Sequence, residues 1–338
     1  MKAYRIVSGA NIAGLELHEE KRPALGPNEV RVGVRAVSLN FRDLMFARGA
    51  YLVTSKEPRI PCSDGAGEVV EIGAKVQRFK VGDRVATTFF PHWIDGEPTP
   101  LNTAGALGGE RDGTLAEEIV LSEESLVSLP DHMDFAAGAT LSCAAVTAWN
   151  SLFVAGNLKA GDTVLLQGTG GVSIHALQLA HAAGLQTIIT SSSDAKLQRA
   201  RELGAAATIN YRTNPEWQEE VLRITGGRGA DLVLEVGGQD TLQRSVVATR
   251  MGGTVALIGG LSGWELSVVA FKLIAGARRL AGIFVGSRKM FEDLNRLASL
   301  AKIRPVVDRT FPFNEARAAY EYLASGNHFG KVVVRLGQ

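Results

Sequence analysis

Six short apolar segments, rich in β-branched residues, recur between residues 163 and 285, and segments with helical spacing separate them. This alternation is typical of a parallel sheet covered by helices, because a chain needs a long crossover connection before it can start a second parallel strand. We therefore predict an α/β fold in which six strands form a doubly wound sheet. The predicted strands are 163–166, 187–190, 207–210, 231–234, 254–258 and 280–285.

The segments between these strands carry apolar residues at helical spacing. Gly184 and Gly204 follow the first two segments, and glycine readily adopts the left-handed conformation that ends a helix. The predicted helices are 174–183, 195–203, 215–225 and 241–250.

The first part of the chain has a different pattern. Residues 29–37 alternate between apolar and polar at period two, and residues 65–73 form a short apolar segment that begins and ends at glycine. Both patterns predict strands of a β-rich domain. A helix over 315–324 and a strand over 331–335 are also assigned to this domain. The predicted organisation is a β-rich domain over 1–126 and 288–338, interrupted by a dinucleotide-binding domain over 127–287.

A glycine-rich loop, Gln167-Gly168-Thr169-Gly170-Gly171-Val172-Ser173, joins the first of the six strands to a helix. Gly168 permits a tight turn, Gly170 lets the backbone approach a pyrophosphate, and the free N–H groups of the helix N-terminus favour an anion. Ser173 occupies the third glycine position of this motif. The alternative is a purely structural turn. The predicted cofactor contacts are Gly168, Thr169, Gly170, Gly171 and Val172.

The second strand ends in Thr190-Ser191-Ser192-Ser193-Asp194-Ala195-Lys196, where NAD-binding proteins commonly place an acid for the ribose hydroxyls. Hydroxyl side chains such as Ser192 occupy that position here, and Lys196 offers a positive charge for a 2′-phosphate. The pattern favours NADP(H) over NAD(H). Two alternatives stay open: Asp194 could serve an NAD ribose, and Lys196 could be a solvated helix residue beside a capping Ser193 or Asp194.

Charge and cysteine content narrow the classes of function. The 36 Lys and Arg residues nearly balance the 35 Asp and Glu residues, which argues against a nucleic-acid partner. No apolar segment is long enough to span a membrane, and the N-terminus lacks the pattern of a signal peptide. Cys62 and Cys143 are the only cysteines and lie outside any paired motif. We expect a cytoplasmic enzyme with reduced thiols and a small-molecule substrate.

Several motifs, in this order, resemble the medium-chain dehydrogenase/reductase superfamily, in particular its zinc-free branch of quinone oxidoreductase-like and alcohol dehydrogenase-like proteins. The resemblance covers nearly the whole chain. The motifs are Asn40-Phe41-Arg42-Asp43, Arg48-Gly49-Ala50-Tyr51, Asp64 to Gly73, Phe79 to Val85, Leu141 to Trp149, Gly168 to Val172, Ile209-Asn210-Tyr211 and Gly330-Lys331-Val332-Val333.

The resemblance implies a GroES-like catalytic domain, a Rossmann domain inserted into it, and an active site in the cleft between them. It also implies that Asn40, Tyr51 and Thr147 line the nicotinamide end, and that Lys196 and Tyr211 hold the adenosine phosphate of NADPH. Gly259, after the fifth strand, is a further predicted cofactor contact. Relatives pair through the last strand of the Rossmann sheet, and a homodimer is therefore expected.

Zinc-dependent relatives hold their metal with cysteine, histidine and acid side chains at positions that match Asn40, Ser63 and Cys143. An amide and a hydroxyl are poor replacements for such ligands, so we predict no catalytic zinc. Without a Lewis acid, hydride transfer favours acceptors that are already electrophilic, such as quinones and α,β-unsaturated carbonyl compounds.

The candidate catalytic residues are polar side chains of the first domain that can stabilise a developing oxyanion. The proton would come from Tyr51 or from water. Two alternatives remain, a zinc-free alcohol or aldehyde dehydrogenase and a non-enzymatic NADPH-binding protein. The candidates are Asn40, Arg42, Tyr51 and Ser63.

Overall fold

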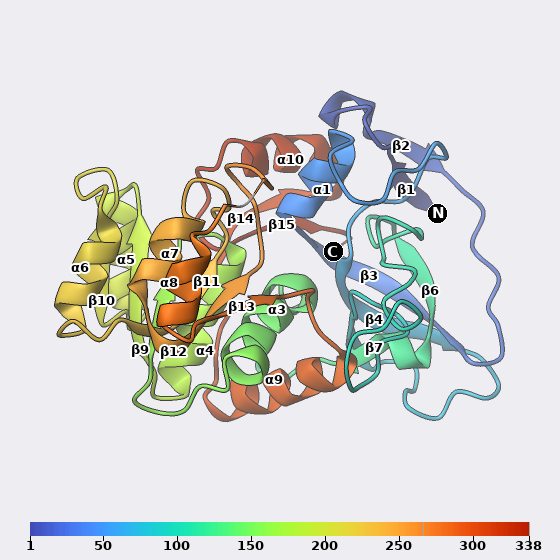
Figure 1. Ribbon diagram of the computed structural model, residues 1–338. Coiled ribbons are helices and arrows are strands. Elements are labelled where there is room, and N and C mark those ends of the chain that lie inside the picture. Colours follow the sequence, from blue (N-terminus) through green and yellow to red (C-terminus); the bar gives the residue numbers. More distant parts are fainter. Residues whose placement is uncertain (266, 338) are drawn as a thin grey trace. The chain divides into compact units, whose positions relative to one another are not determined.

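Figure 1 shows a computed structural model of the chain, which describes residues 1–265 and 267–337. The chain divides into two units, one formed by Met1–Val146 with the residues from Gly286 onward, the other by Thr147–Val285. The sequence pattern predicts that the second unit begins at residue 127. In the structure, residues 127–146 pack with the first unit, because helix α2 (Phe135–Ala139) contacts strands β3 (Glu29–Leu39) and β4 (Asp64–Ile72).

The second unit contains the predicted doubly wound sheet of six parallel strands, in the order β10-β9-β8-β11-β12-β13. This is the order of a Rossmann sheet, and it confirms the predicted fold class. The strands are β8 (Thr163–Leu166), β9 (Gln186–Ser191), β10 (Ala207–Asn210), β11 (Ala230–Glu235), β12 (Thr249–Leu257) and β13 (Arg279–Gly282).

Helices cover this sheet, and the middle residues of its central strands are apolar because both of their faces are buried. Leu165, Val233 and Val255 from neighbouring strands are fully buried in one cluster with Val221 and Val246 from the helices. The four predicted helices are present. They and one further helix are α4 (Gly171–Ala182), α5 (Asp194–Glu202), α6 (Trp217–Ile224), α7 (Leu242–Ala248) and α8 (Ala270–Ala275).

The first unit is built around a seven-stranded sheet in which the long strand β3 pairs with three others. The last strand of the chain, β15 (Lys331–Arg335), is antiparallel to β3 and places Val332 opposite Leu39. The other members are β4, β5 (Arg84–Thr87), β6 (Glu118–Ser122), β7 (Leu126–Ser128) and β14 (Val307–Pro312), and a separate hairpin pairs β1 (Lys2–Arg5) with β2 (Glu16–Glu19).

Helices complete the first unit. The helices are α1 (Phe41–Ala47), α2, α9 (Arg288–Leu300) and α10 (Ala316–Ala324), while the short α3 (Val146–Trp149) lies at the division between the units and has a π-helical turn on each side, Leu141–Ala145 and Asn150–Ala155. In the part of the chain that the structure describes, no helix has the length and apolar character needed to cross a membrane.

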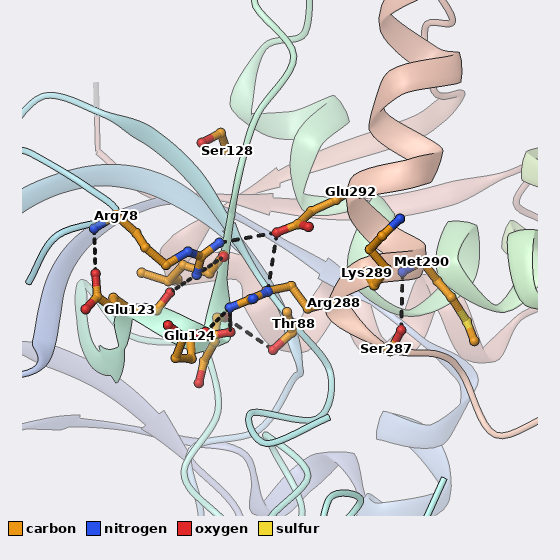
Figure 2. A network of polar contacts seen from close by, with 12 residues as sticks. Arg78, Thr88, Glu123, Glu124, Ser128, Ser287, Arg288, Lys289, Met290 and Glu292 are labelled. Atoms are coloured by element: carbon orange, nitrogen blue, oxygen red, sulfur yellow. Dashed lines mark hydrogen bonds and ion pairs between the residues drawn. The ribbon is translucent and has the colours of Figure 1, made fainter. Parts of the chain in front are cut away.

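A polar network fixes α9 to the strands of the first unit (Figure 2). Arg288 pairs with Glu124 and lies 3.3 Å from Glu292, one helical turn further along. Glu292 is also 3.3 Å from the guanidinium of Arg78, whose backbone N–H donates to the carboxylate of Glu123 at 2.6 Å. Two basic and three acidic side chains therefore tie α9 to the segment between β6 and β7 and to the segment between β4 and β5.

Candidate functional site

The glycine-rich loop of the second unit leaves open space beside its backbone. Gly168 has φ +69°, and Gly170 is the N-cap of α4. A methyl group in place of a hydrogen on either glycine would meet no described atom within 4 Å, apart from its chain neighbours. The loop thus presents the helix N-terminus and bare backbone to an anion, as a dinucleotide pyrophosphate requires.

Gln167 anchors this loop, a role that the sequence did not reveal. Its amide donates to Glu235 (2.8 Å) and to Ser245 (2.7 Å), and its side-chain oxygen accepts from the backbone of Val236 and Gly237 (3.2 Å each). All four hydrogen bonds join the end of β8 to β11 and the segments that follow it. Gln167 therefore fixes the loop at the point where the strand order of the sheet reverses, which is where α/β proteins bind ligands.

Ser173, at the third glycine position of the motif, has a structural role as well. It is buried, and its hydroxyl donates to the carbonyl of Gln167 at 2.6 Å. This hydrogen bond joins the first turn of α4 to the end of β8, so a small polar residue replaces the usual glycine without separating helix and strand.

The predicted adenosine-side residues Ser192, Lys196 and Tyr211 lie at the carboxyl ends of β9 and β10, which are neighbours in the sheet. The backbone N–H of Tyr211 donates to the carbonyl of Ser191 at 3.1 Å, and the Tyr211 side chain is 42% exposed. Ser193 caps α5 by accepting from the N–H of Lys196 at 3.4 Å.

Asp194, the alternative ribose ligand, already accepts a hydrogen bond of 2.7 Å from the side chain of Asn210. That contact ties it to β10.

Gly259 and Thr147 also belong to the second unit. The N–H of Gly259 donates to the carbonyl of Glu235 at 3.3 Å, and a Cβ atom at Gly259 would lie 3.0 Å from the carbonyl of Val236. Gly259 therefore lies after β12 on the side of the sheet where the glycine-rich loop begins. Thr147 is buried in α3, and its carbonyl accepts from the hydroxyl of Ser151 at 2.7 Å.

The first unit contains a buried polar cluster around Asn40. Its backbone N–H donates to Asp43 at 2.7 Å at the start of α1. Its side-chain oxygen accepts from the ammonium of Lys331 at 2.5 Å, and the same ammonium donates to the carbonyl of Leu39 at 2.7 Å. The Lys331 nitrogen also lies 3.8 Å from Asp64. Lys331 is 3% exposed, and although it lies in one of the motifs of the resemblance, the sequence did not assign it to the site.

Ser63 and Cys143 meet Asp64 in the same unit. The Ser63 hydroxyl donates to Asp64 at 2.6 Å, and the backbone N–H of Cys143 donates to the other carboxylate oxygen at 3.3 Å. Ser63 and Asp64 are completely buried. Burial, with the nearby charge of Asp64, raises the pKa of Cys143 to about 12, so its thiol is protonated at neutral pH.

Arg42 and Tyr51 form a second contact group of the first unit. The Arg42 guanidinium lies 4.9 Å from the centre of the Tyr51 ring and 4.8 Å from that of Phe89, and Nη1 donates to the carbonyl of Leu107 at 2.6 Å. Burial raises the pKa of Tyr51 above its ordinary value, although the charge of Arg42 opposes this shift. The Tyr51 hydroxyl is therefore protonated at neutral pH.

Three donor groups in these two clusters are buried without a hydrogen-bond partner among the described residues. They are Nδ2 of Asn40 and both Nε and Nη2 of Arg42. A buried donor without a partner costs about 1–3 kcal/mol, so an acceptor atom that meets it would be favoured. Their chemistry suits an acceptor oxygen.

The residues that match zinc ligands do not supply a metal site of ordinary chemistry. The side-chain oxygen of Asn40 accepts a hydrogen bond from Lys331, and the hydroxyl of Ser63 donates one to Asp64. Of the three matching positions, Cys143 is therefore the one with a standard metal ligand. Across residues 1–265 and 267–337, no group of three or more His, Cys, Asp and Glu side chains is arranged to hold a metal ion.

Comparison with known proteins accounts for both units. Residues 26–131 match the family described as alcohol dehydrogenase GroES-like domain, and residues 171–300 match the family described as zinc-binding dehydrogenase. The chain is 43% identical to a zinc-type alcohol dehydrogenase-like protein of Schizosaccharomyces pombe, with 92% of each chain covered. It is 32% identical to a quinone oxidoreductase of Pseudomonas aeruginosa, with 95% of each chain covered.

Solved structures of similar proteins have the same fold. An NAD-dependent alcohol dehydrogenase is 31% identical, with a TM-score of 0.90 and full coverage of both chains. A 2-octenoyl-CoA carboxylase reductase, solved with NADP and 2-octenoyl-CoA, is 25% identical, with a TM-score of 0.87 over 99% of this chain and 87% of the other. The chain therefore belongs to the medium-chain dehydrogenase/reductase superfamily, and it is an NAD(P)-dependent oxidoreductase of that family.

Proposed function

We propose that this oxidoreductase works without zinc and uses NADPH to reduce quinones or α,β-unsaturated carbonyl compounds. The observation that carries the proposal is the set of buried donors without partners, Asn40 Nδ2 and Arg42 Nε and Nη2, at and next to a position that matches a zinc ligand. Such donors stabilise negative charge on a substrate oxygen through hydrogen bonds, without a metal.

The acceptor class follows from what hydrogen bonds alone can do. They do not replace the several kcal/mol with which a metal stabilises charge on the oxygen of an alcohol or plain ketone. They suffice for an acceptor whose conjugation spreads the charge, as in a quinone or an enone. Similar proteins carry names that include quinone oxidoreductase and 2-octenoyl-CoA carboxylase reductase, which supports this class.

Tyr51 is the proposed proton source, with water as the alternative. Its raised pKa keeps the hydroxyl protonated at neutral pH, so that it can donate when negative charge develops on the substrate. Ser63 is the weaker candidate, because its hydroxyl already donates a hydrogen bond to Asp64.

The second unit is the proposed cofactor site. Gly168, Thr169, Gly170, Gly171 and Val172 would hold the pyrophosphate, and Ser192, Lys196 and Tyr211 the adenosine phosphate of NADP(H). The NADP preference rests on the charge of Lys196, because the one hydrogen bond that Asp194 accepts from Asn210 leaves its second oxygen to a ribose hydroxyl. When bound, the cofactor supplies the hydride.

Purified protein of known zinc content tests this proposal. NADPH and NADH absorbance would be followed with quinones, enones, enals, ketones and alcohols. We expect NADPH oxidation with the quinones, the enones or both, by protein that holds far less than one zinc per chain. Stoichiometric zinc, or turnover of plain alcohols alone, would contradict the proposal. Tight NADPH binding with no turnover at all would favour a non-enzymatic role.

The second unit is also the proposed contact of a homodimer. Strand β13 is the last strand of its sheet, and Phe271 and Ile274 of α8 are 73% and 75% exposed, with Leu280 of β13 exposed as well. A strand at the edge of its sheet, in a unit that also exposes apolar side chains, fits a second copy of the chain.

Phe271→Glu with Ile274→Glu should therefore convert a dimer into a monomer in sedimentation velocity. Leu300→Glu, on an exposed position of α9, is the matched control and should remain a dimer. A monomeric wild-type protein would contradict this assignment.

A further inference from the structure

We infer that Lys331 is a positioning residue that fixes the side-chain amide of Asn40, so that this amide offers its N–H groups and not its oxygen to the substrate. The inference rests on the proposed function and deepens it. It assigns the orientation of one donor to a residue 291 positions further along the chain.

The direction of the amide follows from the chemistry of its partner. An ammonium group has donors only, so the atom that meets Lys331 Nζ at 2.5 Å must be the amide oxygen of Asn40. The second hydrogen bond of Lys331, to the carbonyl of Leu39 at 2.7 Å, fixes the ammonium against the backbone next to Asn40. The amide nitrogen then points away from Lys331, and it is buried without a partner among the described residues.

The positive charge matters as well as the contact. A charged donor makes a stronger hydrogen bond than a neutral one, and a bond to the amide oxygen polarises the N–H groups on the other side of the amide. Asp64, 3.8 Å from the ammonium, compensates the buried charge. The arrangement gives Asn40 a fixed orientation and a strengthened donor.

The same contact has a consequence for metal binding. An asparagine side chain binds a metal through its oxygen, and here that oxygen accepts from a buried cation. Lys331 therefore gives the residue at the position of a zinc ligand the opposite function, that of a hydrogen-bond donor.

Kinetics of a double-mutant cycle test the inference. Lys331→Met keeps the length of the side chain and removes the charge. We expect kcat to fall by about tenfold to a hundredfold, the cost of a misplaced catalytic contact, with KM for NADPH unchanged. In an Asn40→Ala background, Lys331→Met should cause no further fall, because its effect passes through Asn40.

Lys289→Met is the matched control. Lys289 pairs with Asp293 at 2.6 Å on α9 of the same unit, and its loss should leave kcat unchanged. If Lys331→Met does not fold, Lys331→Ala replaces it, and added ethylammonium should restore part of the lost kcat. Independent effects of Lys331 and Asn40 on kcat, or no restoration by the amine, would overturn the inference.

A measurement without turnover separates this inference from the proposed function. The side-chain amide signal of Asn40 in a nitrogen–proton NMR spectrum is assigned by its loss in Asn40→Asp. We expect Lys331→Met to shift this signal and Lys289→Met to leave it in place. A shifted signal in a protein that reduces no acceptor would overturn the proposed function only. An unshifted signal in an active enzyme would overturn the inference only.

Discussion

The glycine-rich loop of the second unit and the Asn40 cluster of the first unit are built in opposite ways. The loop presents backbone groups of consecutive residues, and its shape is set by Gly168 and Gly170. The cluster consists of side chains, and Lys331 joins it from the last strand of the chain. A backbone site is local in the sequence, whereas a side-chain site exists only once the sheet has brought distant residues together.

The largest effect should come from a side chain added to the loop. Gly170→Val should raise the Kd for NADPH by about a thousandfold, or about 4 kcal/mol, because the added atoms occupy the space that a pyrophosphate needs. The melting temperature should stay close to that of the wild type. Apart from the chain neighbours, no described atom lies within 4 Å of a Cβ at residue 170, and the backbone of Gly170 is extended. Titration calorimetry and thermal unfolding would measure the two quantities.

Gly282→Val is the control for this substitution. It also places its Cβ in open space, but on β13 and away from the loop, so NADPH affinity should not change. Normal NADPH affinity in Gly170→Val would show that the loop does not contact the cofactor. The contrast between the glycine-rich loop and the Asn40 cluster would then be wrong.

The second largest effect concerns a buried carboxyl in each unit. Burial raises the pKa of Asp43 to about 6, although Arg42, the N–H of Asn40 and Lys331 oppose the shift and Asp64 adds to it. Burial also acts to raise the pKa of Asp231, but hydrogen bonds from Arg228, Thr163 and Arg250 outweigh it and lower that pKa to about 2.

The two pKa shifts change the stability of the folded protein in opposite directions. The folded state disfavours the charged form of Asp43, so its unfavourable contribution of about 3 kcal/mol is present above pH 6 and disappears as pH falls toward 4. The favourable contribution of Asp231 is present above pH 4 and is lost as pH falls through about 2. Asp43→Asn should therefore gain stability relative to the wild type at pH 7.5, and the gain should shrink at pH 4.5.

Thermal unfolding across this pH range measures the difference. The matched variant, Asp231→Asn, should lose stability at pH 7.5 and approach the wild type only in strong acid. A loss of stability in Asp43→Asn that grows with pH would mean that the fold stabilises the charged form of Asp43, which contradicts a raised pKa.

The smallest effect should come from the loss of a contact to the 2′-phosphate of NADPH. Lys196→Ala should raise KM for NADPH about tenfold, equivalent to about 1.4 kcal/mol, and leave KM for NADH unchanged. The effect is modest because Lys196 is half-buried and acts as a point charge. Initial rates with both cofactors would measure it, and equal changes for NADPH and NADH would remove the basis for the NADP preference.

The six-stranded sheet could be predicted because each parallel strand leaves a short apolar run between helices. The predicted ends of the helices and strands were less accurate. The predicted helix 241–250 ends at Ala248, since Thr249 turns to extended backbone and begins β12. The predicted strand 280–285 ends at Gly282, and Val285 has φ +55°.

The first unit was harder to predict from sequence. Strand β14 and helix α9 were not predicted.

Some site residues could likewise be predicted from the sequence, and others could not. The glycine motif located the loop, but Gln167 precedes the motif, and only its pairing with Glu235 and Ser245 shows that it anchors the loop. Asn40 and Ser63 were found through a resemblance. Lys331 had no local signal for its role, because its partners Leu39, Asn40 and Asp64 are brought to it by the pairing of β15 with β3 and of β3 with β4.

The place of β15 beside β3 sets an order of assembly during synthesis. All strands of the second unit lie between residues 163 and 282, so that sheet can close as soon as this continuous segment has left the ribosome. In the sheet of the first unit, residues 36–39 of β3 lack β15 as a partner until residues 331–335 have been made, although β6 already pairs with residues 29–33. The unit that begins first therefore finishes last, and the charge of Lys331 reaches Asn40 only in that final step.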